Sequence, residues 1–238
     1  MNHAASPNPW QTALCQRLAQ ALAQSRLAHA PLTDADTDAD AERGTPATRW
    51  RLPARLIPQG GAAAALTEML GVGKPALQVD LLARCLQHYR QQLAVDPTQD
   101  DLGAALAAYL GACRQAFDHE PLNAQRWRAI TQWLKAWVID ELPWDDAPLS
   151  ERQDAFERFA ALAVALGEWT VQASRQGTGS QASAAWMARS SLRGQLGLDL
   201  PALCAVLRSQ DVKTAVSPSA AADEIGAAAY RQQPRDPV

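Results

Sequence analysis

The densest group of ionisable side chains in this sequence is the run Asp118-His119-Glu120, which follows Phe117. Imidazole and carboxylate groups are the side chains used most often for general acid–base catalysis. The run falls between two expected helices, however, where Asp and His also serve helix capping and the helix dipole. We therefore interpret the run as structural, with a general acid–base role, tested at His119, or metal binding as the alternatives.

No spacing typical of a metal or nucleotide site is present. The four histidines include no pair at the separation that places two ligands on one helix face. The run Gly71-Val72-Gly73-Lys74 lacks the first glycine and the Ser or Thr of a phosphate-binding loop. The alternating aspartates of 33–42 lack the glycine and final glutamate of a calcium loop. We predict no metal, no cofactor and no catalytic residue, and we favour a protein that is not an enzyme.

Two glutamates, Glu141 and Glu168, lie beside Leu or Trp in expected helical stripes. Their ordinary role is an ion pair with an arginine such as Arg126 or Arg152. A catalytic pair instead needs two converging carboxylates, and convergence cannot be read from a sequence.

Tryptophan is the most unusual feature of the composition, with eight in 238 residues. Trp133 and Trp137 are one helical turn apart, and Trp127 lies nearer the other side. The helix that carries them is therefore expected to be apolar around much of its circumference, as in the centre of a bundle. Because indole joins a large apolar area to an N–H donor, tryptophan suits either a core or a binding surface. The exposed area of Trp133, Trp137 and Trp144 distinguishes the two.

The elements that position these residues are predicted to be helices. Ala, Leu, Gln and Arg dominate the composition, whereas the strand formers Ile, Tyr and Phe are scarce. Thr98 is a plausible N-cap, with Asp101 three residues later. Apolar residues at spacings of three and four, interrupted by Pro and Gly, predict helices over 9–30, 62–70, 75–95, 98–117, 123–142, 148–176, 180–196 and 199–210.

The predicted fold class is all-α. We expect a single helical bundle of about five to seven helices with short connections, plus an N-terminal helix on an acidic linker and a flexible C-terminal tail. The segment 50–58 contains two prolines and is predicted to be extended on the core. The expected parts are an N-terminal amphipathic helix, an acidic linker, the bundle and a disordered tail, at 1–30, 31–48, 49–210 and 211–238.

The net charge and the cysteines indicate which partners and which cellular compartment to expect. A net charge of −3 favours neither nucleic acid nor an acidic membrane, and acidic neighbours offset the arginines at 49–55. Neither a signal peptide nor a stretch long enough to span a bilayer is evident. We predict a cytoplasmic protein, which leaves export by another route open. The four cysteines form no C-x-x-C pair and are predicted to be buried in a reducing compartment.

The region 50–207 resembles a family of uncharacterised bacterial all-α proteins, a domain of unknown function. The resemblance lies in an Arg-Leu-x-Pro-like extended segment, a helix ending in tyrosine, an Asp-x-x-x-Ala-x-x-x-Tyr helix, a Glu-Trp pair and a Leu-Gly-x-Asp-Leu segment, here 51–58, 88–90, 101–109, 168–169 and 196–200. It implies an all-α fold and supplies no activity. Members of that family usually carry export signals, from which this chain departs.

We predict a non-enzymatic helical module for protein–protein interaction, or an accessory module, with an unidentified protein partner and an open oligomeric state. The alternative is a small-molecule-binding helical protein or enzyme with a pocket between helices, lined by Trp133, Trp137 and Trp169. A deep cavity with converging acidic groups would favour the alternative, and a flat exposed apolar patch would favour the module. The candidate surface or pocket residues are Trp127, Trp133, Trp137, Trp144, Trp169, Glu168 and His119.

Overall fold

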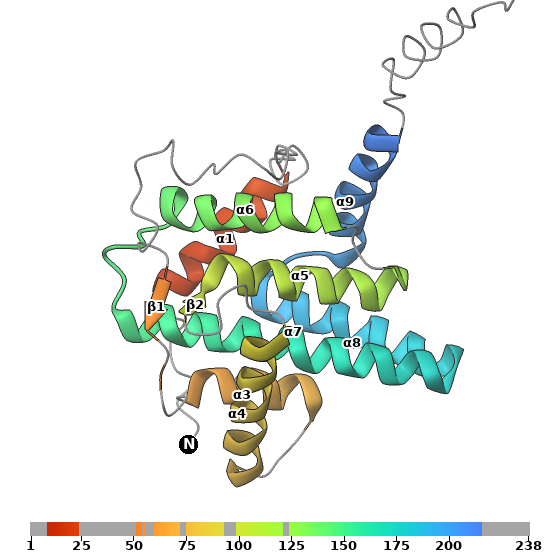
Figure 1. The fold of residues 1–238 in the computed structure, drawn as a ribbon, viewed down its shortest axis with the longest axis horizontal. Coiled ribbons are helices and arrows are strands. Elements are labelled where there is room, and N and C mark those ends of the chain that lie inside the picture. The colour runs from red at the N-terminus through yellow and green to blue at the C-terminus, as the bar shows by residue number, and fades with distance from the viewer. Residues whose placement is uncertain are drawn as a thin grey trace, which may run out of the picture.

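The computed structural model describes residues 9–23, 51–53, 55, 60–71, 75–92, 99–120 and 124–215 (Figure 1). Within these residues the chain forms eight helices and one small two-stranded sheet, so the all-α prediction is confirmed. The elements in chain order are α1 (Pro9–Ala23), β1 (Arg51–Pro53), α3 (Gly60–Leu70), α4 (Pro75–Gln92), β2 (Gln99–Asp101), α5 (Leu102–Asp118), α6 (Ala124–Glu141), α7 (Leu149–Gln176), α8 (Thr178–Leu196) and α9 (Leu200–Ala215).

Proline and glycine set several helix ends, as the sequence predicts. Helices α1 and α4 begin at Pro9 and Pro75, where the missing proline N–H costs no intrahelical hydrogen bond. Helix α8 ends before Gly197, whose φ of 67° lies in the left-handed region that glycine adopts most readily. The N–H of Gly197 donates to the carbonyl oxygen of Arg193 at 2.9 Å, which closes the last turn.

The start of α5 differs from the prediction. Asp101, not Thr98, is the N-cap, because its carboxylate accepts a hydrogen bond from the N–H of Ala104 at 2.9 Å. Asp101 is also the last residue of β2, which pairs antiparallel with β1 and places Leu52 opposite Asp100. The extended conformation predicted for 50–58 is thus seen at β1. Three-residue strands with Pro53 in one of them carry no periodic signal.

Helix α5 is the centre of the fold, in place of the tryptophan-rich helix that the sequence analysis put there. Every residue from Leu102 to Leu110 is buried, and α5 packs against α6, α7, α8 and α9. Figure 1 shows α5 between α6 on one side and α7 on the other. Helix α6 packs mainly on α5 and exposes one side. The physical reason is size, since an Ala- and Gly-rich helix admits neighbours on all sides at short interaxial distance.

Close packing of α5 on α6 depends on Gly103. A Cβ at this position would lie 2.6 Å from the Cα atom and 2.7 Å from the backbone nitrogen of Lys135. These atoms belong to the backbone of α6, so no side-chain rotation can relieve the contact. The two helices therefore touch through their main chains here.

Helix α1 contributes to the same core as the bundle. Trp10, Leu14 and Leu18 are buried, and the Trp10 and Trp144 ring centroids lie 6.3 Å apart. Helix α9 continues to Ala215, beyond the predicted bundle boundary at 210. The acidic linker at 31–48 and the chain after 215 lie outside the described residues.

Among the described residues, none of the helices combines the length and the apolar character that crossing a membrane requires. The longest, α7, spans Leu149–Gln176 and carries charged residues along its length.

Candidate functional site

The tryptophans of α6 and the loop after it divide between core and surface. Trp137 and Trp144 are buried, whereas Trp127 and Trp133 are half-buried. Trp133 stacks on Trp137 with ring centroids 6.1 Å apart and an interplanar angle of 19°. Of the three tryptophans whose exposure distinguishes a core from a binding surface, Trp137 and Trp144 therefore belong to the core, and Trp133 covers its edge.

Trp169 is not brought together with the tryptophans of α6. It lies on α7 with 42% of its surface exposed. Helices α6 and α7 each pack on α5 rather than on each other, so Trp169 belongs to a different helix layer from the pair Trp133–Trp137. The structure does not assemble the predicted three-tryptophan pocket.

The predicted acidic and histidine candidates also lie apart. Glu168 is exposed, and one of its carboxylate oxygens lies 3.3 Å from Nδ1 of His88, which is also exposed. His119 follows the C-terminal end of α5, while Glu141 ends the antiparallel α6, at the other end of this helix pair. The converging constellation that would favour an enzyme is not formed by these residues.

Asp118 and His119 have structural contacts. The Asp118 carboxylate accepts hydrogen bonds from Arg114 on α5 and from both Nε and Nη2 of Arg208 on α9. His119 is the C-cap of α5 at a φ of 60°, and its N–H donates to the carbonyl oxygen of Gln115 at 2.9 Å. The run therefore ends α5 and ties α9 to it.

No group of three His, Cys, Asp or Glu residues within the described ranges could hold a metal ion. All four cysteines are free, three of them buried and Cys15 half-buried. Burial raises the pKa of the Cys85 thiol to about 11 and that of Cys204 to about 12, and it also raises the pKa of Cys15 and Cys113. A raised pKa keeps these thiols protonated and poorly nucleophilic near neutral pH.

We expect a thiol reagent such as a disulfide dye at about pH 8 to modify Cys15 before the other three cysteines of the native protein. Cys15 is the least buried thiol, although its Sγ donates a hydrogen bond to the carbonyl oxygen of Gln195 at 3.2 Å. All four thiols should react once the chain is unfolded. Substitution of Cys15 by Ser should remove the earliest phase of the reaction. Reaction of Cys113 ahead of Cys15 would show that the α5–α9 packing opens readily.

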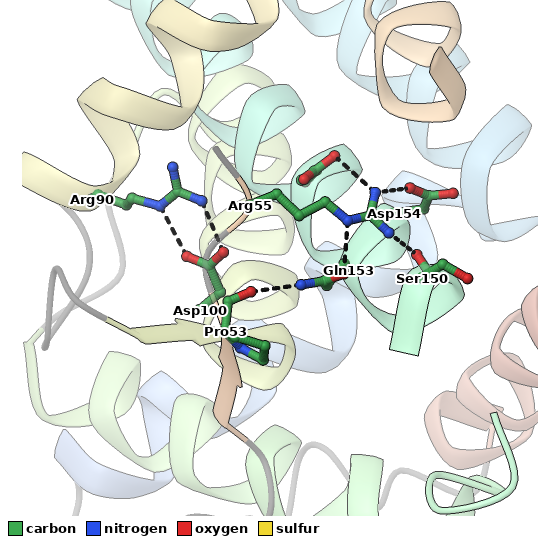
Figure 2. A network of polar contacts seen from close by, with 8 residues as sticks. Pro53, Arg55, Arg90, Asp100, Ser150, Gln153 and Asp154 are labelled. Atoms are coloured by element: carbon green, nitrogen blue, oxygen red, sulfur yellow. Dashed lines mark hydrogen bonds and ion pairs between the residues drawn. The ribbon is translucent and has the colours of Figure 1, made fainter. Parts of the chain in front are cut away.

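The most extensive polar cluster in the described residues joins the strand pair to α7 (Figure 2). Arg55 donates from Nε to Oε1 of Gln153 at 2.7 Å and from Nη1 to Oδ1 of Asp154 at 2.6 Å. Its Nη2 donates to the carbonyl oxygen of Ser150 at 2.6 Å. The residues of this cluster, called the Arg55–Arg90 network below, are Pro53, Arg55, Arg90, Asp100, Ser150, Gln153, Asp154 and Glu157.

The second half of the Arg55–Arg90 network ties α4 to β2. Arg90 donates from Nε and Nη2 to the two carboxylate oxygens of Asp100, at 2.9 Å and 2.8 Å. Asp100 is 2% exposed. This hydrogen bonding to Asp100, together with the charge of Glu157, raises the pKa of Arg90 despite its partial burial.

The contacts of the network join separate elements of the fold. Glu157 is 1% exposed and lies 3.8 Å from Nη1 of Arg55, and Gln153 donates to the carbonyl oxygen of Pro53 at 2.6 Å. The carboxylates of Asp100 and Asp154 are paired with the guanidinium groups of Arg90 and Arg55. We therefore assign the network to the attachment of β1 and β2 to α7.

The most exposed large apolar side chain in the described residues is on α8. Trp186 is 71% exposed in the middle of this 19-residue helix. The buried residues of α8 include Ala184, Ala188 and Leu192, and helical geometry places Trp186 on the opposite side. Four exposed residues recur there at spacings of four, three and four, and we call them the α8 outer face: Ala182, Trp186, Arg189 and Arg193.

The α8 outer face is basic within an acidic protein. The whole chain has a net charge of −3, yet the thirty positions 169–198 contain three arginines and no acidic residue. Arg189 makes an exposed ion pair with Asp199 at 3.7 Å. Such pairs contribute little and exchange readily with water or with a partner.

This face was not predicted from the sequence. A helix was expected over 180–196, but Trp186 was not among the candidate residues. The available signal was the i, i+4 series from Ala184 through Ala188 and Leu192 to Leu196, which defines the buried side and leaves Trp186 about 200° away.

Comparison of the chain with protein-family models, with curated proteins and with solved structures finds no match in any of the three.

Proposed function

We propose that this protein is a non-enzymatic helical interaction module that binds a partner protein through the α8 outer face. The observation that carries the proposal is the exposure of Trp186. Tryptophan is highly buried on average, and when it is exposed it is enriched at the energetic centres of protein interfaces. Here an exposed tryptophan lies in a regular helix near Arg189 and Arg193, and arginine is also enriched in such centres.

The other features of the fold support this reading. The candidate catalytic groups of the sequence are dispersed, and the carboxylates of the Arg55–Arg90 network are paired with arginines. The pocket alternative has less support, because α5 separates Trp169 from Trp133. We further propose a reducing compartment such as the cytoplasm, since four thiols remain unpaired. Kinship with the bacterial all-α family of unknown function also remains a proposal, based on the quoted segments.

Substitution of Trp186 by Ala is expected to weaken binding of the partner by about 10- to 100-fold, the effect of removing an interface anchor. The partner would be captured from the native cell, purified and titrated against both proteins. Because the side chain is exposed, the substitution should leave the thermal unfolding midpoint almost unchanged.

The matched control is Val171→Ala on α7, which also truncates an exposed apolar side chain, 48% exposed. It should leave the affinity within a factor of about two. Equal affinities of the wild-type protein and the Trp186→Ala variant for every purified partner would contradict the proposed function.

A further inference from the structure

We propose that the partner segment seated on the α8 outer face is an acidic amphipathic helix. This inference rests on the proposed function and specifies its ligand. The spacing of four, three and four between Ala182, Trp186, Arg189 and Arg193 is that of the a and d positions of a heptad repeat. A row with this period presents one continuous seam to a second helix that runs alongside.

The surface around the seam permits close approach of a helix. Ser183, Ser190 and Gly194 are exposed beside it, and all three are small. A Cβ added at Gly194 would meet no atom within 4 Å, so the space over this flank is open. Trp186 therefore projects beyond its small neighbours and can enter the space between four side chains of a facing helix.

The positive charge of the α8 outer face indicates that the partner helix is acidic. Arg189 and Arg193 are exposed one turn and two turns after Trp186, with no acidic residue on α8 to neutralise them. The nearest neutralising group shown is Asp199, which lies 3.7 Å from Arg189 and is itself 58% exposed. The long arginine side chains can extend from the seam to its rim, where carboxylates flanking an apolar stripe would complement both guanidinium groups and lysines would be repelled.

The test uses two labelled synthetic helical peptides of roughly three heptads with the same leucine seam. One peptide carries glutamate at the flanking positions and the other carries lysine. Binding to the full chain is measured by fluorescence anisotropy at about 50 mM and about 200 mM salt. We expect the acidic peptide to bind at least about tenfold more tightly than the basic peptide, with a preference that falls as salt rises.

Two matched variants locate the contact. Arg193→Glu should weaken the acidic peptide by about fivefold or more. Arg175→Glu makes the same charge change on the side of α7 away from its buried residue Ala173, and should leave binding within about twofold. Circular dichroism of each variant confirms that the helices are retained. Equal binding of the two peptides, or equal loss in the two variants, overturns the inference.

Other ligands of the α8 outer face would give different experimental results. A dimer of the purified protein that dissociates in the Trp186→Ala variant would assign the face to a second copy of this chain and overturn the inference. Binding of a single-stranded oligonucleotide as tight as that of the acidic peptide would overturn it too. If Trp186→Ala loses the native partner while both peptides bind alike, the proposed function stands and only this inference fails. If Trp186→Ala keeps the partner, both fail.

Discussion

Replacing Gly103 by alanine is expected to lower the free energy of unfolding by about 2 to 3 kcal/mol, as overpacking of a tight core does. The added methyl group would lie 2.6 Å from the Cα atom of Lys135, so α5 and α6 must separate. At this chain length such a loss corresponds to a fall of about 5 to 10 °C in the unfolding midpoint. Thermal unfolding followed by circular dichroism measures it.

The control for this prediction is Gly167→Ala on α7. A Cβ at Gly167 meets no atom within 4 Å, and the position lies inside a long helix. Alanine there should stabilise the protein by about 0.5 to 1 kcal/mol through its higher helix propensity. If Gly103→Ala also stabilised the protein, the direct main-chain contact between α5 and α6 would be refuted.

Removal of the Asp100 carboxylate by alanine is expected to cost about 3 kcal/mol of stability, within the range found when one partner of a buried ion pair is lost. Asp100 is 2% exposed and receives two hydrogen bonds from Arg90, which is 21% exposed and would retain an uncompensated charge. Urea unfolding gives the free energy, with an unchanged slope if the native state stays compact.

A double-mutant cycle with Arg90→Met isolates the pair. The two substitutions together should cost less than the sum of their separate effects, with a coupling of about 1 to 3 kcal/mol. Glu168→Ala, which breaks the exposed contact with His88, serves as the control and should change stability by less than about 0.5 kcal/mol. Additive effects of Asp100→Ala and Arg90→Met would show that the two side chains do not interact.

The helices of this fold could be predicted because proline and glycine mark their ends. Pro9 and Pro75 begin helices, and Gly71 and Gly197 follow the ends of two others. These residues act locally, through a missing donor or a backbone angle, so their effect is visible in the sequence.

The packing of helices and strands against one another could not be predicted in the same way. The sequence analysis placed the tryptophan-rich α6 at the centre because its apolar residues surround the helix. The centre is α5, whose Ala and Gly residues have little area but allow four helices to approach. The pairing of β1 with β2 joins segments far apart in the chain, and both strands contact α7.

The sequence predicted the residue type at the candidate site but not the residue itself. Tryptophan was identified as the residue type of interest, but four of the proposed tryptophans lie in or beside the core, and Trp186 was not proposed. The buried charges Asp100 and Glu157 were also missed, because burial of a charge depends on a partner such as Arg90 or Arg55 supplied by another segment.

The most direct test places a photo-cross-linking amino acid at position 190 in the native cell, because Ser190 is exposed one helical turn after Trp186 and its replacement leaves Trp186 in place. We predict one dominant cross-linked protein from position 190, with no such product from Val171, an exposed control position on α7. The cross-link should lie in a glutamate- or aspartate-rich helix of the captured protein, as mass spectrometry of the joined peptides would establish. The same products from both positions, or none from position 190, would contradict the claim that the α8 outer face is the binding surface.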